Sequence, residues 1–176
     1  MTAPGRRRRT RLAAAAAPSS FVEPLTPEGY ASARRALMRR DPVLGAVIKA
    51  VGPCRMADRQ RNDHLTALAG SIVSQQLSTR AAATIFGRFV GLFPDAPPLS
   101  ATAILGLDDV TLRGAGLSGQ KVRYIRDLCQ RIVDGRLALD TLESLDDEGV
   151  IRTLTDVKGF GRWTAEMFLM FRLHRP

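Results

Sequence analysis

The chain has 176 residues, 45% of them apolar and 24% charged, a composition typical of a one-domain soluble globular protein. It carries 26 Lys and Arg residues against 17 Asp and Glu, and the net charge of +9 indicates an anionic partner, most simply nucleic acid. No apolar run is long enough to span a membrane, and two cysteines with two histidines argue against a disulfide framework or a Cys- and His-based metal site.

The first 20 residues differ in composition from the rest of the chain. They contain Arg6–Arg9 and Arg11 and no acid, followed by Ala13–Ala17 and Pro18. A signal peptide is a weak alternative here, because the apolar run is short, rich in alanine and closed by proline. We interpret residues 1–20 as a disordered basic arm that attracts phosphates, and residues 21–176 as the folded domain of a cytoplasmic, nucleoid-associated protein.

Short polar residues mark where helices begin, in two cases directly before a proline. These predicted N-caps are Thr26, Asp41, Ser78, Ser100, Asp108 and either Asp146 or Asp147. Apolar residues at helical spacing predict a helix near 63–76, a second after Ser78 and a third over 122–133. The proline-rich segment Phe93–Ser100 predicts a loop, and Gly114, Gly116 and Gly119 predict turns. No segment alternates strictly between apolar and polar residues, so the predicted fold class is all-α.

The most informative segment runs from Leu154 to Ala165. Its pattern predicts a helix, a tight turn containing Gly159 and Gly161, and a second helix that starts at once. The free N–H groups at the start of that helix would form an anion site suited to a DNA phosphate, reinforced by Lys158 and Arg162. The alternative is a glycine-rich connection between two packed helices with no ligand.

Three segments together carry a resemblance to a known family. The residues Leu154–Ala165, in a match that continues to Glu166, resemble the helix-hairpin-helix motif of DNA repair proteins. Ile72–Ser78 and Gly116–Ile125 resemble segments of the 3-methyladenine DNA glycosylase II branch of the helix-hairpin-helix DNA glycosylase superfamily. The matches occur in the family's order over about residues 65–176. The resemblance implies the compact all-helical bundle of that superfamily, without the N-terminal β domain of larger members and lacking the family's C-terminal part.

The resemblance also implies roles for residues of the hairpin. The residues expected to bind a DNA phosphate are Lys158, Gly159, Phe160, Gly161, Arg162 and Thr164. A monovalent cation would be held by the backbone carbonyls of Thr155, Val157 and Gly159, and no other cofactor is expected. Trp163 would line the base pocket and stack on a cationic purine. Gln75, Gln76 and Leu77 lie where the family inserts a wedge into the gap left by a flipped base.

Each of these roles has a plainer alternative. Trp163 is alternatively a core aromatic of the last helix. Gln75 and Gln76 are alternatively a solvated helix end, and Glu166 is interpreted as a favourable charge in a first helical turn. His64 and His174 are interpreted as surface or capping residues. The last helix is apolar nearly all round, which predicts an exposed apolar patch.

The implied activity is that of a base-excision repair enzyme. It would flip an alkylated purine out of double-stranded DNA and hydrolyse its N-glycosidic bond as a monomer. Trp163 stands where the lyase branch has a nucleophilic lysine, so the enzyme would be monofunctional. The catalytic aspartate is expected past Pro176, and Glu166 is the only acid between Gly161 and Pro176. The alternatives are a non-catalytic DNA-binding protein, a degenerate glycosylase fragment, or an all-α protein with no nucleic-acid role.

Overall fold

The structure is a computed structural model that describes residues 24–55, 63–94 and 98–175. The predicted arm of residues 1–20 lies outside these ranges. Within them every regular element is helical, so the all-α prediction is confirmed. The elements are α1 (Pro27–Arg40), α2 (Pro42–Val51), α3 (His64–Ser74), α4 (Thr79–Val90), α5 (Ala101–Gly106), α6 (Asp109–Gly114), α7 (Gly119–Val133), the 3-10 helix η1 (Leu139–Ser144), α8 (Asp147–Thr155) and α9 (Arg162–Phe171).

Short polar residues begin the helices from α1 to α8, which confirms the predicted caps, and the structure adds Asp63 and Ser118, which were not predicted. Each N-cap side chain accepts a hydrogen bond from an amide of the first turn, which satisfies a donor that the helix leaves free. These caps are Thr26, Asp41, Asp63, Ser78, Ser100, Asp108, Ser118 and Asp146. The turn predicted at Gly119 is wrong, because Ser118 caps α7 and Gly119 is its first residue. Similarly, Gly114 is the last residue of α6.

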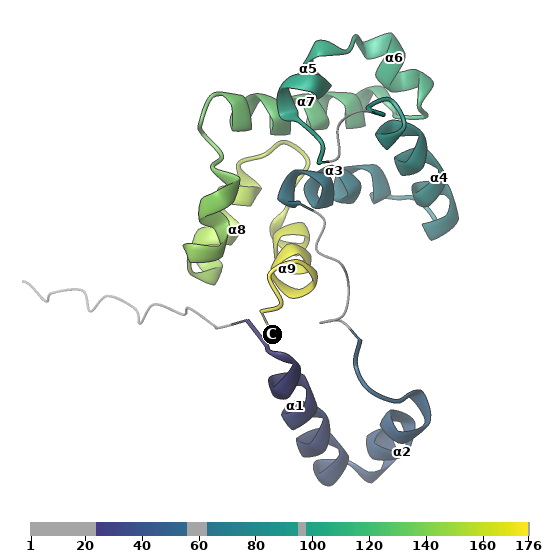
Figure 1. The fold of residues 1–176 in the computed structure, drawn as a ribbon, viewed down its shortest axis with the longest axis vertical. Helices are drawn as coiled ribbons and strands as arrows, with labels where there is room; N and C mark the ends of the chain where they lie inside the picture. Colours follow the sequence, from purple (N-terminus) through teal and green to yellow (C-terminus); the bar gives the residue numbers. More distant parts are fainter. Residues whose placement is uncertain (1–23, 56–62, 95–97, 176) are drawn as a thin grey trace, which may run out of the picture.

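The core lies where α3, α5, α7, α8 and α9 pack together. Figure 1 shows α7 and α3 crossing the upper part of the molecule, with α8 and α9 below them. The largest side chains that are fully buried include Leu68, Ile72, Phe89, Ile104, Leu112, Ile125, Leu128 and Leu154. Burying each of them contributes about 1.5–3 kcal/mol to folding. This core holds α7 and the α8–α9 connection in fixed relative positions.

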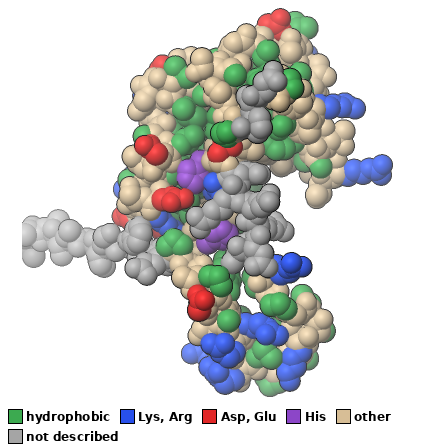
Figure 2. Space-filling view, viewed as in Figure 1, with side chains coloured by type: hydrophobic (Ala, Val, Ile, Leu, Met, Phe, Trp, Pro, Cys, Tyr) green, Lys and Arg blue, Asp and Glu red, His purple; other side chains and the backbone are tan. Residues whose placement is uncertain are grey.

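The helices α1 and α2 pack mainly against each other and lie apart from the rest of the molecule in Figure 1. No residue of α1 is buried, and α2 buries only Gly45. A backbone hydrogen bond from Leu25 to the carbonyl of His174 connects this pair to the end of the chain at 2.9 Å. On the face that Figure 2 shows, Lys and Arg side chains gather over these two helices.

The end of the chain differs from the prediction. His174 was expected at the surface or in a cap, but it is buried, with a left-handed φ of 56°. Its neighbour Arg175 is also buried and donates to the carbonyls of Leu145 and Glu143 at 2.7 and 2.8 Å. His64 is the first residue of α3, and only 13% of its side chain is exposed. Tertiary packing therefore covers both histidines.

The last helix, α9, buries one face and exposes another. Ala165, Phe168 and Leu169 are buried, whereas Met170 and Phe171 are 40% and 52% exposed. The exposed apolar surface predicted for this helix is therefore present. None of the described helices has both the length and the apolar character needed to cross a bilayer. The described ranges also contain no group of three His, Cys, Asp or Glu side chains placed to hold a metal ion.

Candidate nucleic-acid interface

The connection between α8 and α9 is a tight turn anchored to the core and open on its other side. Thr155 ends α8 and Arg162 begins α9, and the amide of Phe160 donates to the carbonyl of Val157 at 3.1 Å. Val157 and Phe160 are buried, whereas Lys158, Gly159 and Gly161 are exposed. The structure therefore contains the predicted helix, turn and helix. We call residues 156–161 the hairpin.

The start of α9 is the part of the hairpin suited to an anion. Gly161 is the N-cap and has no side chain to satisfy the first amides. No acceptor among the described residues bonds the amides of Gly161, Arg162, Trp163 or Thr164. Unsatisfied amides at a helix N-terminus carry partial positive charge and bind phosphate well. The geometry fits the predicted phosphate site.

The two glycines of the hairpin have different structural roles. Gly159 has a φ of +85°, and a Cβ placed on it would lie 2.2 Å from Cδ2 of Tyr124, whose ring packs against the glycine. The hydroxyl oxygen of Tyr124 in turn accepts a hydrogen bond from Gln120 at 2.5 Å. Gly161 has an ordinary φ of −106°, and a Cβ there would meet no atom within 4 Å. Gly159 is therefore required for packing, while Gly161 leaves space in front of the α9 amides.

The basic side chains of the hairpin are already paired with acids. Lys158 places its Nζ 3.8 Å from Asp127, and Arg162 donates to Glu148 at 2.6 Å and to Glu166 at 2.9 Å. The hydrogen bond from Arg162 is the main reason that the pKa of Glu148 is lowered. Lys158 and Arg162 were expected to reinforce the phosphate site, but these acids offset their charge. The main-chain amides are therefore the principal anion-binding groups of the hairpin.

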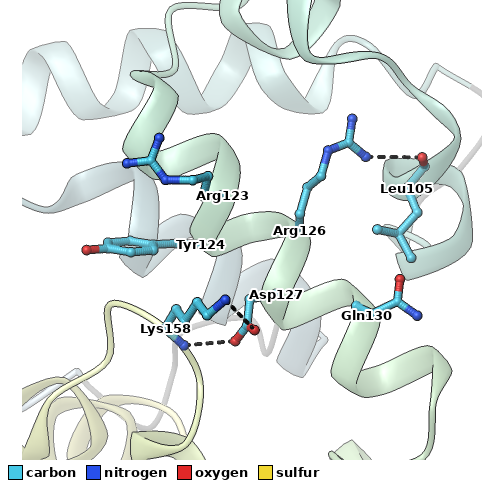
Figure 3. Close-up of a pocket in the computed structure, with 7 residues that line it drawn as sticks. All are labelled: Leu105, Arg123, Tyr124, Arg126, Asp127, Gln130 and Lys158. Carbon is cyan, nitrogen blue, oxygen red and sulfur yellow. Dashed lines mark hydrogen bonds and ion pairs between the residues drawn. The ribbon is translucent and has the colours of Figure 1, made fainter.

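An open hollow lies between α7 and the hairpin, as shown in Figure 3. Arg126 is held on one side of it by Asp109 and by the carbonyls of Leu105 and Leu107 at 2.7, 3.1 and 2.6 Å. Asp127 accepts a hydrogen bond from the amide of Lys158 at 2.9 Å. Arg123 also lines the hollow, is exposed and has no carboxylate partner among the described residues. Its guanidinium is therefore available to an anion that approaches the hairpin.

The turn between α3 and α4 contacts the hairpin through one side chain. Gln75 donates from Nε2 to the carbonyl oxygen of Gly159 at 2.9 Å. The helix predicted over 63–76 ends at Ser74, because Gln75 leaves the helical conformation with a ψ of 129° and Gln76 has a left-handed φ of 57°. Gln76 and Leu77 are both exposed. Gln75 thus points to the hairpin, and Gln76 and Leu77 remain at the surface beside it.

The three carbonyls predicted to hold a monovalent cation are partly engaged. Gly159 accepts the hydrogen bond from Gln75, and Val157 accepts the one from the Phe160 amide. Each carbonyl oxygen has a second lone pair, so Thr155, Val157 and Gly159 still offer acceptors to a cation. The cation site remains a prediction.

The comparison with known families identifies the fold to which this hairpin belongs. The model of the HhH-GPD superfamily, described as base excision DNA repair proteins, matches residues 69–174. This match covers α4 to α9 completely and includes both the Gln75 turn and the hairpin. The chain belongs to the HhH-GPD superfamily.

Several known proteins resemble this chain in sequence or structure. DNA-3-methyladenine glycosylase 1 of Schizosaccharomyces pombe is 30% identical over 131 residues, which cover 73% of this chain and 58% of that protein. The crystal structure of a DNA-3-methyladenine glycosidase from Bacillus halodurans matches with 37% identity and a TM-score of 0.62, over 79% of this chain and 63% of that one. A 3-methyladenine DNA glycosylase of S. pombe in complex with abasic DNA matches with 28% identity and a TM-score of 0.69, over 80% and 69% of the two chains. The chain thus spans about three-fifths of the first two relatives.

The burial and contacts of the predicted site residues decide between the alternatives left open for them. The alternative that Trp163 is a core aromatic is wrong, because 70% of this residue is exposed. The alternative that Gln75 and Gln76 form a solvated helix end fits Gln76, which is exposed. It does not fit Gln75, whose side chain donates a hydrogen bond to the hairpin. The interpretation of Glu166 as a first-turn charge fits its place in α9, where it pairs with Arg162. The binding roles of these residues remain predictions.

Two residues that hold the hairpin in place were not predicted from the sequence. Tyr124 packs on Gly159, and Asp127 bonds the Lys158 amide. Tyr124 belongs to a segment that carried the resemblance, but no local pattern indicated what its ring contacts. Asp127 lies on the same helix, 31 positions before Lys158. A contact between residues so far apart in the sequence depends on how α7 packs against the hairpin. The spacing of residues within one helix does not show this packing.

Asp127 makes the stability of the hairpin dependent on pH. Burial acts to raise its pKa, but hydrogen bonds and charges from Lys158 and Arg131 lower it overall. Its ionised form therefore stabilises the fold above the unfolded pKa of about 3.9, and this contribution is lost as the pH falls through the lower folded value. We expect Asp127→Asn to lower the free energy of unfolding by about 1–2 kcal/mol at pH 7. In urea unfolding series, this difference should shrink below pH 4.

A matched control is Asp109→Asn, which removes an exposed acid paired with Arg126. Exposed ion pairs contribute little, so we expect a change below about 0.5 kcal/mol at either pH. An Asp127→Asn effect that is equally large at pH 3 and pH 7 would contradict the electrostatic explanation.

Proposed function

We propose that this chain acts on double-stranded DNA containing alkylated purines, as a cytoplasmic, monomeric glycosylase of the 3-methyladenine type. The observation that carries the proposal is the uncapped start of α9 at Gly161, exposed beside an exposed Trp163. The start of α9 thus presents an anion site and an aromatic ring side by side. The anion site suits a phosphate of the DNA strand, and the ring suits a cationic damaged base. The 3-methyladenine glycosylases among the relatives support this assignment.

The proposed mechanism starts with the α9 amides, which would bind a phosphate of the damaged strand. A nucleotide held in this way can leave the base stack at a cost of a few kcal/mol, which is lower for a damaged pair. The indole of Trp163 would stack on the flipped purine, and a cation–π contact favours a positively charged alkylated base. Water would then replace the base at the sugar carbon. Trp163 has no amine to form a Schiff base, so no lyase step would follow.

A second candidate function is DNA binding without base release. It is favoured by the engagement of Glu166, whose carboxylate is already paired with Arg162 at 2.9 Å. Glycosidic hydrolysis needs a carboxylate near the sugar to stabilise positive charge. The two candidates share the hairpin and differ in whether the base leaves.

One experiment separates these functions. The chain is incubated with methylated duplex DNA, released 3-methyladenine is measured by chromatography, and affinity for the same duplex is measured by fluorescence anisotropy. Release of 3-methyladenine by the unmodified chain, and its loss in the Trp163→Ala variant, would support the glycosylase function. Salt-sensitive binding without release supports the second function. The absence of binding at low salt would contradict both.

Arg123 provides a prediction about the DNA-bound state. Because its guanidinium is exposed beside the hairpin without a carboxylate partner among the described residues, we expect it to contact a phosphate of the same strand. Arg123→Ala should weaken binding to all sequences alike and reduce the slope of log affinity against log salt by about 1. Anisotropy titrations at several salt concentrations measure this slope.

The control for Arg123 is Arg136→Ala, which removes an arginine already paired with Asp134 at 2.7 Å. Its salt slope should equal that of the unmodified chain. If the Arg123 and Arg136 variants show equal slopes, Arg123 does not contact the strand.

A further inference from the structure

The hydrogen bond between Gln75 and Gly159 joins two exposed loops that are 84 positions apart in the sequence. One loop is the hairpin, which presents the α9 amides. The other is the turn after α3, which presents Gln76 and Leu77 at the surface. The Gln75 side chain is only half-buried, and it is the one side chain of this turn that bonds the hairpin among the described residues.

The turn after α3 is held from the protein side as well. Lys121 donates from Nζ to the carbonyl of Val73 at 2.6 Å, which binds α7 to the last turn of α3. The amide of Leu77 donates to the carbonyl of Ser74 at 3.2 Å. Gln76 adopts its left-handed conformation between these contacts. A non-glycine residue keeps that conformation only where its surroundings impose it.

The hairpin has its own contacts with α7. Tyr124 packs on Gly159, and Asp127 accepts from the amide of Lys158. Both loops are thus fixed to α7, by Lys121 on one side and by Tyr124 and Asp127 on the other. The hydrogen bond from Gln75 to Gly159 connects the two loops directly, in addition to their separate contacts with α7. A displacement of the Gly159 carbonyl is therefore transmitted to the residue that precedes Gln76.

We propose that Gln75 is a positioning residue that couples phosphate binding at the hairpin to the placement of Gln76 and Leu77 against the base stack. The proposal rests on the proposed function, since it requires a DNA strand at the α9 amides. When the strand is bound there, the bond to Gly159 sets where Gln76 and Leu77 meet the duplex. Gln75 itself contacts protein, which changes the wedge role predicted for it. Without this bond, the hairpin would still bind phosphate. The turn after α3 would no longer hold Gln76 and Leu77 at a fixed position beside the gap left by the displaced base.

The test compares two duplexes, one intact and one containing a tetrahydrofuran abasic analogue, which presents a ready gap in the stack. The variant Gln75→Met keeps the side-chain length and removes the N–H donor. We expect its preference for the abasic duplex over the intact one to fall about fivefold, the effect of one hydrogen bond. Affinity for the intact duplex should change less than twofold, because phosphate binding remains. Anisotropy titrations give both affinities.

Two comparisons keep the test specific. Gln130→Met makes the same change at an exposed residue of α7 that bonds Asp134, and it should leave the preference unchanged. In a Gly161→Ala background, where the strand docks poorly, the Gln75 effect should disappear. A preference equal to that of the unmodified chain in a folded Gln75→Met variant would overturn the coupling and leave the proposed function standing. An unmodified chain that binds DNA but shows no abasic preference would overturn both.

Discussion

Replacing Gly159 by alanine is expected to lower the free energy of unfolding by about 3 kcal/mol. The new Cβ would lie 2.2–2.7 Å from three atoms of the Tyr124 ring, and the residue would have to keep a φ of +85°. The left-handed backbone costs a side-chain-bearing residue about 1–2 kcal/mol, and forcing the ring aside adds about 1–3 kcal/mol. Urea unfolding followed by circular dichroism measures the loss. Affinity for duplex DNA should fall together with stability.

Gly161→Ala is the matched control and separates binding from folding. A Cβ at Gly161 meets nothing within 4 Å, and its φ of −106° suits any residue. We therefore expect stability within about 1 kcal/mol of the unmodified chain, the scale of an N-cap change. The methyl group would nevertheless occupy the space in front of the α9 amides, so affinity for duplex DNA should fall about tenfold, as for the loss of one charged hydrogen bond. Unchanged affinity in this variant would contradict the phosphate site.

Arg175→Met is expected to lower the free energy of unfolding by about 3 kcal/mol. Only 1% of the Arg175 side chain is exposed, and its guanidinium bonds Asp147 at 3.0 Å and the carbonyls of Leu145 and Glu143. Methionine fills similar space but leaves a partly buried carboxylate and two carbonyls without their donor. Thermal and urea unfolding report the loss. We also expect α9 to become less protected in hydrogen exchange, because Arg175 ties the segment after it to the start of α8.

The corresponding control is Arg152→Met, which removes a 72%-exposed arginine lying 4.0 Å from Asp146. Exposed pairs of this kind contribute little, so the change should stay below about 0.5 kcal/mol. Equal losses in the Arg152 and Arg175 variants would show that the buried hydrogen bonds of Arg175 are not the cause.

The helices of this protein were predictable because their signals are local. Thr26, Asp41, Ser78, Ser100, Asp108 and Asp146 each bond an amide two or three positions ahead, so a few residues of sequence contain the whole interaction. Local signals also indicated the hairpin, since glycines followed at once by a helix leave α9 without a side-chain cap. The turn predicted at Gly119 was wrong because a glycine after a serine cap fits a turn and a first helical residue equally well.

The all-α class, the helix starts, the exposed hairpin and the family resemblance could be inferred from the sequence alone, because each depends on neighbouring residues or on an ordered set of motifs. The side chains that surround the hairpin are known from the three-dimensional structure and not from the sequence. The tertiary structure placed Tyr124 on Gly159, bonded Gln75 to the Gly159 carbonyl, paired Arg162 with Glu148, and buried His174. These contacts join residues from different helices, and their partners are selected by how those helices pack around a shared core. A sequence pattern of period 3.6 shows which face of a helix is buried, but it does not show what that face meets.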